Sequence, residues 1–210
     1  MPFFDFLLNN RDEVARLAAE HLALVAISML AACAIGIPLG IALTRRERLR
    51  QWALGAINVI QTIPSLALFG FLIPVPFIGG VGARTAIVAL TLYALLPIVR
   101  STCVGIAGVD RNVLEAARAM GMTPSQILRR VELPLAASVI LAGVRVAAVI
   151  GVGVATIAAA IGAGGLGQYI FRGVSMVNHS VILAGAVPAA LLAIAADAAL
   201  GWVERRFAVR

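Results

Sequence analysis

Few residues in this chain could carry covalent or acid–base chemistry. Its 210 residues include ten acidic side chains, two histidines, two cysteines and seventeen basic side chains, and every basic one is an arginine. Without lysine the chain supplies neither the lysine of a phosphate-binding P-loop nor a Schiff base. No Ser/His/Asp spacing, paired-carboxylate motif or metal-ligand pattern stands out. The sequence therefore predicts no catalytic, cofactor or metal site.

The cysteines and histidines lie in surroundings that do not predict ligands. Cys33 and Cys103 fall in apolar runs without metal-ligand spacing, and we interpret them as small core residues rather than a disulfide. His21 and His179 are far apart in the sequence, and neither is near a cluster of Cys, Asp and Glu. We expect neither a metal site nor a proton relay from them.

Residues 162–167, Gly-Ala-Gly-Gly-Leu-Gly, match the spacing of a dinucleotide-binding glycine motif. Such a site needs a strand before the motif, a helix after it and an acidic residue about 20 positions further on. Here an apolar segment precedes the motif, and no acid lies at that distance. We therefore predict a turn with close backbone packing rather than a nucleotide site.

Four polar residues interrupt an apolar stretch. Asn58, Gln61 and Ser65 have the i, i+3, i+7 spacing of one helix face, with Thr62 beside them and Pro64 freeing a carbonyl nearby. Polar groups inside a bilayer face protein or a water-filled path rather than lipid. The spacing fits the lining of a translocation path and polar contacts between helices equally well.

Arg145 is the one arginine in the middle of a long apolar segment, and Asp197 lies at a comparable depth in another. Because a lone arginine inside a bilayer is costly, we expect a partner for it. We predict an Arg145–Asp197 pair with a structural role, in preference to a gate or path.

The elements that position these residues are membrane helices. The chain is 61% hydrophobic and only 13% charged, whereas a soluble domain carries about a quarter charged residues. We predict an all-α, polytopic membrane protein with an interfacial segment at 1–20, one transmembrane domain at 21–203 and a tail at 204–210. Its five predicted spans are 22–43, 52–72, 85–102, 135–161 and 181–202. Gly36 and Gly40 give the first span a small-residue packing face.

The longest polar, arginine-containing interval, 115–134, predicts two short helices with a break between them. Asp110 can cap the first helix, whose apolar residues Val113, Ala116, Ala117 and Met120 share a face, and Gly121 suits a left-handed C-terminal cap. Thr123, Pro124 and Gln126 have the pattern of a capping box that starts the second helix. Leu133-Pro134 predicts a break before the next span.

The arginines predict the orientation. If the loop with Arg45, Arg46, Arg48 and Arg50 is cytoplasmic, twelve arginines lie on that side and four on the other, with Arg145 inside a span. The positive-inside rule then predicts an N-terminus outside, and interval 115–134 and the C-terminus in the cytosol. Since the arginines fall in short loops between spans, the net charge does not indicate nucleic-acid binding.

Interval 115–134 resembles the EAA loop of ABC-importer permeases, whose pattern is EAA-x3-G-x9-I-x-L-P. Glu115, Ala116, Ala117, Gly121, Leu133 and Pro134 match it, and Val131 replaces the isoleucine. Residues 61–67, 93–100 and 161–167 resemble signatures of the osmoprotectant (glycine betaine/choline/carnitine) subfamily. The family resemblance covers roughly residues 55–175.

The resemblance implies a type I importer permease in a bacterial inner membrane that works by alternating access. Its partners would be a second permease copy or paralogue, two cytoplasmic ATPases that bind ATP and Mg²⁺, and an external substrate-binding protein. Glu115, Ala116, Ala117 and Gly121 would belong to the coupling helix that docks into the ATPase, and Pro134 would fix the joint to the fourth span. The alternatives are a permease for another small solute such as methionine, or a secondary transporter or channel without an ATPase.

Overall fold

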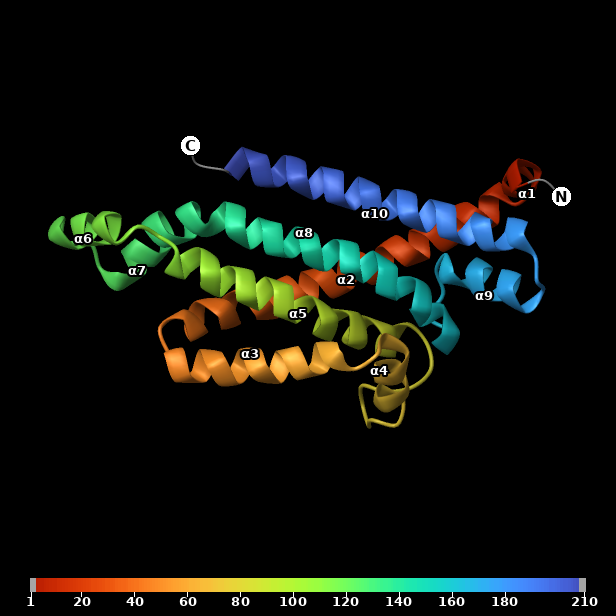
Figure 1. Cartoon of the computed structure of the whole chain (residues 1–210), viewed down its shortest axis with the longest axis horizontal. Coiled ribbons are helices and arrows are strands. Elements are labelled where there is room, and N and C mark those ends of the chain that lie inside the picture. The colour runs from red at the N-terminus through yellow and green to blue at the C-terminus, as the bar shows by residue number, and fades with distance from the viewer. Residues whose placement is uncertain (1–2, 208–210) are drawn as a thin grey trace.

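The computed structural model describes residues 3–207, and within them every regular element is a helix (Figure 1). The predicted all-α fold is confirmed. The helices are α1 (Phe3–Asn9), α2 (Arg11–Thr44), α3 (Glu47–Thr62), α4 (Ser65–Leu72), α5 (Ala83–Ala107), α6 (Arg111–Ala119), α7 (Pro124–Ile127), a π-helix (Leu128–Glu132), α8 (Leu133–Ala158), a 3₁₀ turn (Ala159–Ile161), α9 (Gly167–Ser175) and α10 (His179–Phe207). The outermost residues of segments 1–20 and 204–210, with Arg210, lie outside the described residues.

Four of the five predicted spans appear as continuous helices. Within residues 3–207, α2, α5, α10 and the helix Pro124–Ile161 are long and apolar enough to cross a membrane. The N-terminal boundary is less distinct than we predicted, because α2 begins at Arg11 and runs unbroken into the first span. The position of segment 1–20 relative to the membrane stays a prediction.

The predicted second span, 52–72, is wrong as a single helix. It is split into α3 and α4, which are bent by 100°, so the chain has five spans only if this bent pair counts as one. The bend lies at Ile63-Pro64, where Ile63 is extended, as the residue before a proline tends to be. Ser65 begins α4 beyond the bend, so it does not continue the helix face of Asn58 and Gln61.

The bend is tied to α5 by two hydrogen bonds. The Tyr93 hydroxyl donates to the carbonyl oxygen of Ile63, and Gln61 Nε2 donates to the carbonyl oxygen of Tyr93 at 2.6 Å. The first bond supplies a partner for the Ile63 carbonyl at the bend, and the second supplies one for the Tyr93 carbonyl in α5, to which Pro97 cannot donate.

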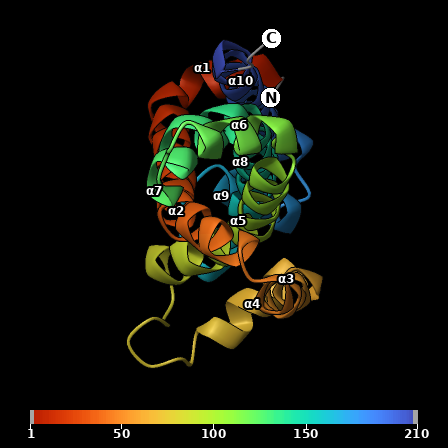
Figure 2. The same cartoon turned by 90° about the vertical axis from the view of Figure 1, so that its left-hand side faces the viewer.

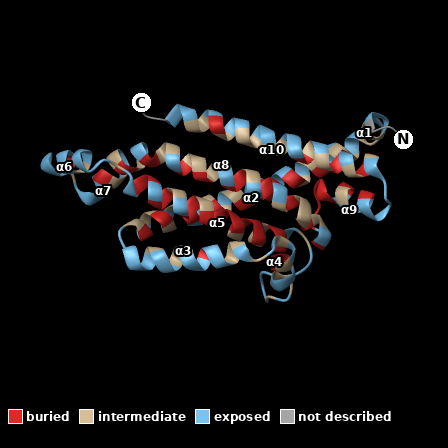
Figure 3. Cartoon of the chain, in the orientation of Figure 1, coloured by how far each residue is buried: buried red, intermediate tan, exposed pale blue. Residues whose placement is uncertain are grey.

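The core lies where α2, α5 and α8 meet, and Figure 3 shows most of the buried residues on these helices. Figure 2 looks along the molecule and shows α3 and α4 to one side of the other long helices. Accordingly Ile57 is the only buried residue within α3. The predicted packing face of Gly36 and Gly40 is confirmed, because both glycines lie against α5.

The molecule has two distinct ends (Figure 1). The α2–α3 connection, α6, α7 and the C-terminal end of α10 lie at one end, whereas α1 and α9 lie at the other. The arginine-rich loop after α2 therefore shares its end with the two short helices of interval 115–134.

Gly40 provides a direct test of this packing. A Cβ on Gly40 would lie 2.6 Å from Thr102 Cβ, a branch point that cannot swing away. We expect Gly40→Ala to lower the free energy of unfolding by about 1–3 kcal/mol through overpacking. Gly153→Ala in α8 is the matched control, because its Cβ would meet nothing within 4 Å. Thermal unfolding in detergent compares the two, and equal stability of both variants would contradict the close α2–α5 contact.

Candidate functional site

The first short helix of the polar interval, α6, is capped as the sequence predicts. Asp110 is its N-cap, and its Oδ1 accepts a hydrogen bond from the backbone N–H of Asn112 at 2.8 Å. On the surface of α6, Arg111 and Glu115 form an exposed ion pair at 3.3 Å, which adds little stability. The cap fixes where α6 begins.

The predicted apolar face of α6 divides into two parts. Ala117 is only 2% exposed and lies against the rest of this chain. Ala116 is exposed, and Val113 and Met120 are 42% and 75% exposed. Ala117 is therefore already covered within this subunit, and its part in docking to an ATPase stays a prediction. The surface open to a partner comprises Val113, Ala116 and Met120, which we call the α6 apolar surface.

The turn after α6 is a Schellman motif. Gly121 has φ +78°, and the backbone N–H groups of Gly121 and Met122 donate to the carbonyls of Arg118 and Ala117. No atom lies within 4 Å of a Cβ built on Gly121, so backbone conformation rather than lack of space requires the glycine. Its predicted role as a C-terminal cap is confirmed.

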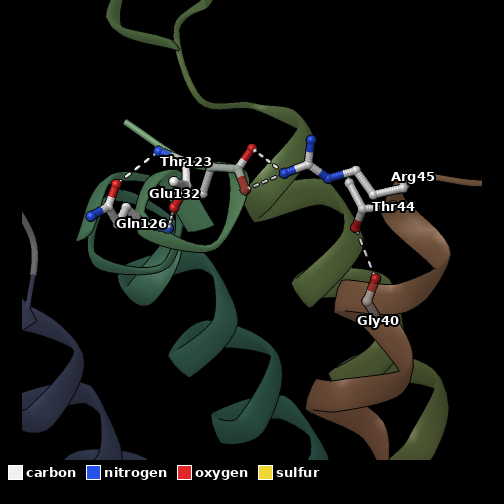
Figure 4. A network of polar contacts seen from close by, with 6 residues as sticks. All are labelled: Gly40, Thr44, Arg45, Thr123, Gln126 and Glu132. Atoms are coloured by element: carbon white, nitrogen blue, oxygen red, sulfur yellow. Dashed lines mark hydrogen bonds and ion pairs between the residues drawn. The ribbon is translucent and has the colours of Figure 1, made fainter. Parts of the chain in front are cut away.

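The second short helix, α7, starts with the predicted capping box (Figure 4). The Thr123 hydroxyl accepts from the Gln126 N–H at 3.4 Å, and Gln126 Oε1 accepts from the Thr123 N–H at 2.8 Å. Pro124 occupies the first helical position, where its missing N–H costs nothing. Both short helices thus have their ends fixed by side-chain or backbone bonds.

The predicted break at Leu133-Pro134 is wrong. The chain stays helical from Pro124 to Ile161, and it passes through the π-helix Leu128–Glu132 before α8. Proline cannot donate the bond to the residue four positions earlier, and in a regular helix its ring clashes with that carbonyl. The wider π turn just before Pro134 accommodates the proline, so the helix continues where the sequence indicated a stop.

The joint between this interval and the membrane helices contains an ion pair that the sequence analysis missed. Glu132, at the end of the π-helix, is 4% exposed, and its Oε1 and Oε2 accept from Arg45 Nη2 at 3.0 and 2.8 Å (Figure 4). Arg45 is the C-cap of α2. The available signal was the single acid in the otherwise apolar run Val131 to Leu135.

The predicted partners Arg145 and Asp197 are in contact. Arg145 Nε and Nη2 donate to Asp197 Oδ1 and Oδ2 at 2.6 and 2.7 Å, a bidentate geometry. Glu204 is a third member that sequence reasoning missed, at 3.3 Å from Arg145 Nη1. Because Glu204 follows Asp197 by two helical turns on α10, helical spacing could have identified it.

The four predicted path residues are not brought together. Gln61 lines a cavity of about 370 Å³ between α3, α5 and α8, which Arg100 also lines, and Asn58 lines a neighbouring one of about 350 Å³. Thr62 donates to the carbonyl of Val59 on its own helix, and Ser65 lies beyond the bend. Of the four predicted path residues, only Asn58 and Gln61 therefore line one of these two cavities, and Arg100 lines both.

The glycine-rich segment 162–167 forms the predicted tight turn. Gly162, Gly164 and Gly165 all have positive φ, and the Gly165 N–H donates to Glu20 Oε2 at 3.1 Å. The neighbouring His21 is fully buried, with Nε2 at 3.1 Å from the Val152 carbonyl oxygen. The turn thus packs onto α2, where a Cβ on Gly164 or Gly165 would meet Glu20 or His21.

The sequence and the fold were compared with those of known proteins, and both comparisons found related transport proteins. Residues 36–209 match the family model described as "Binding-protein-dependent transport system inner membrane component". The chain is 49% identical over 187 residues to the glycine betaine/carnitine/choline transport system permease protein OpuCD of Bacillus subtilis (strain 168), covering 89% of this chain and 80% of that one. It is 46% identical over 202 residues to the carnitine transport permease protein OpuCD of Listeria monocytogenes serotype 1/2a (strain 10403S), covering 96% and 89%.

Among solved structures, a chain of the MetNI methionine ABC transporter in inward-facing conformations is similar over 93% of this chain and 96% of its own length. The TM-score is 0.83 and the sequence identity 29%. The predicted importer-permease architecture is confirmed by this likeness.

The Arg145–Asp197 contact predicts that single and double substitutions do not add. Arg145→Ala leaves two carboxylates without their cation, and Asp197→Ala leaves the guanidinium with Glu204 alone. We expect the double variant to unfold in detergent at a temperature close to that of the worse single variant. Strictly additive decreases in melting temperature would show that the two side chains are not coupled.

Proposed function

The chain belongs to the family of binding-protein-dependent transport system inner membrane components, and on that basis we propose that it carries a quaternary ammonium osmoprotectant across the bacterial inner membrane. It is the permease subunit of an ABC importer, and the ATPase activity belongs to partner subunits. No Lys is present to form a P-loop on this chain.

The choice of solute rests on the relatives. Those named for glycine betaine, carnitine and choline are 46% and 49% identical, whereas the methionine transporter chain is 29% identical. This difference favours a quaternary ammonium solute over methionine. An ATPase-independent transporter would leave the doubly capped α6–α7 segment without a role, and the family membership disfavours it as well.

The observation that carries the ATPase-driven part of the proposal is the α6 apolar surface. A short helix that is capped at both ends, and that exposes Val113 and Met120 to solvent, gains stability when a partner covers these side chains. It lies at the same end of the molecule as the arginine-rich connection between α2 and α3, which the positive-inside rule assigns to the cytosol. A cytoplasmic ATPase is the partner that would dock there, with Glu115 at the rim.

The rest of the assembly follows from the same proposal. Two ATPases bind ATP and Mg²⁺, close on each other and move the α6–α7 segments of two permease copies or paralogues. The spans then rock between outward-open and inward-open arrangements, and a binding protein delivers the solute at the end with α1 and α9. We propose that a second permease copy covers the cavities that Asn58, Gln61 and Arg100 line.

ATPase docking predicts that a charge on the α6 apolar surface prevents assembly. We expect Met120→Glu to abolish co-purification of the ATPase and solute uptake, because a carboxylate would be desolvated in the interface. Met176→Glu is the matched control for ATPase association only, since Met176 is also exposed, at 60%, but follows α9 at the opposite end, where the binding protein would dock. Pull-down from membranes measures ATPase association, and retention of the ATPase by Met120→Glu would contradict docking at this surface.

The choice of solute predicts an uptake pattern. Vesicles containing the complete importer should accumulate radiolabelled glycine betaine, choline or carnitine only when ATP is present inside. An excess of unlabelled methionine should not compete. Competition by methionine, or uptake without ATP, would support one of the two alternative functions instead.

A further inference from the structure

Glu132 stands out because it is buried in apolar surroundings. It is the only carboxylate among residues 3–207 that is buried, at 4% exposure. A carboxylate removed from water is costly unless a cation and hydrogen bonds compensate it. Arg45 provides both, with one guanidinium nitrogen in contact with both carboxylate oxygens. An apolar residue would fit this position at lower cost, so the charge has to be explained.

The ion pair joins two parts of the chain that are 87 residues apart. Arg45 closes α2, the first membrane helix, whereas Glu132 belongs to the helix that continues from α7. The other contacts at this joint are apolar and gather around Ile106, Ala136 and Ile140, with Ile37 and Ile41 from α2 and Leu128 and Leu133 beside them. Apolar contacts are not directional and allow sliding, whereas a charged hydrogen bond fixes one relative position.

The π-helix determines where Glu132 points. Its five residues end at Glu132, and the Leu133 N–H donates to the Leu128 carbonyl across the wider turn. Each π-helical residue rotates the chain by less than an α-helical residue does, so the side chains that follow are turned relative to α7. Single π turns are rare and frequently occur at functional sites. Here the turn lies between the docking segment and the membrane helix, next to the contact with α2.

We propose that the Arg45–Glu132 pair makes α2 move together with the α6–α7 segment. The movement of a docked ATPase then reaches the membrane helices by two routes, along α8 and through Arg45 into α2. This inference rests on the proposed function, since it requires an ATPase at α6. Arg45 and Glu132 are positioning residues in this role: they contact neither solute nor nucleotide, and they act on transport through the helices that they join.

Three variants separate this role from simple stabilisation. Glu132→Gln keeps the size and one acceptor but removes the charge. The double variant Arg45→Met/Glu132→Met replaces the buried Glu132 and the half-exposed Arg45 by flexible apolar side chains, a change that buried ion pairs often tolerate. Arg50→Gln is the control, because Arg50 pairs with Glu47 three residues earlier in α3, at the same end of the molecule but within one helix.

The experiment uses the whole importer, purified with its ATPase and binding protein and reconstituted into vesicles. Radiolabelled glycine betaine uptake and ATP hydrolysis are measured in the same preparation. We expect Glu132→Gln and the double variant to retain the ATPase and to hydrolyse ATP within about twofold of wild type. The solute moved per ATP should fall by about fivefold or more, the scale of a typical coupling between sites. Arg50→Gln should match wild type in both quantities.

Each result that contradicts these expectations leads to a different conclusion. An unchanged ratio of solute to ATP in the double variant would show that the pair only stabilises the fold. Loss of the ATPase, or unfolding of both Glu132 variants at the assay temperature, would likewise overturn the proposal, because neither is a defect of coupling. A wild-type complex that lacks an ATPase or moves no quaternary ammonium solute would instead refute the proposed function.

Discussion

Every backbone N–H and carbonyl inside the bilayer has to find its partner within the protein, and most of this structure follows from that requirement. The long helices meet it internally. Where the chain departs from a regular helix, a specific group compensates. At the Ile63-Pro64 bend the Tyr93 hydroxyl donates a hydrogen bond to the freed carbonyl of Ile63. Before Pro134 a π turn replaces the α-helical hydrogen-bond pattern. At these two places a neighbouring helix and a wider turn satisfy the irregular backbone.

Charged side chains inside the bilayer likewise need partners within the protein. Arg145 is held by two carboxylates of α10, and Glu132 by the arginine that ends α2. Each cluster links two membrane helices that are distant in the sequence. The residues around Glu132 are apolar, and those beside Arg145 are alanine, valine and isoleucine, so these ion pairs supply the directional part of the packing.

The sequence predicted what depends on local chemistry. The caps at Asp110, Thr123 and Gly121 and the turn at 162–167 each follow from residue types within a few positions, and the Arg145–Asp197 contact followed from the scarcity of charge. The errors are tertiary in origin. At Pro64 the helix bends, and this bend depends on support from another part of the chain. At Pro134 the helix continues without a break. The contact from Arg45 to Glu132 depends on helices packed from far along the chain, which periodicity does not report.

The double capping of α6 and α7 has a consequence for the rate at which subunits associate. Because the Schellman turn and the capping box fix this segment before any partner arrives, docking requires little additional ordering of the chain. A preformed helix also presents the same surface at each encounter, so association does not wait for a rare conformation to appear. In the proposed complex with an ATPase, the lifetime would then depend mainly on how much of Val113, Ala116 and Met120 the ATPase covers, and subunits would exchange without the permease unfolding locally.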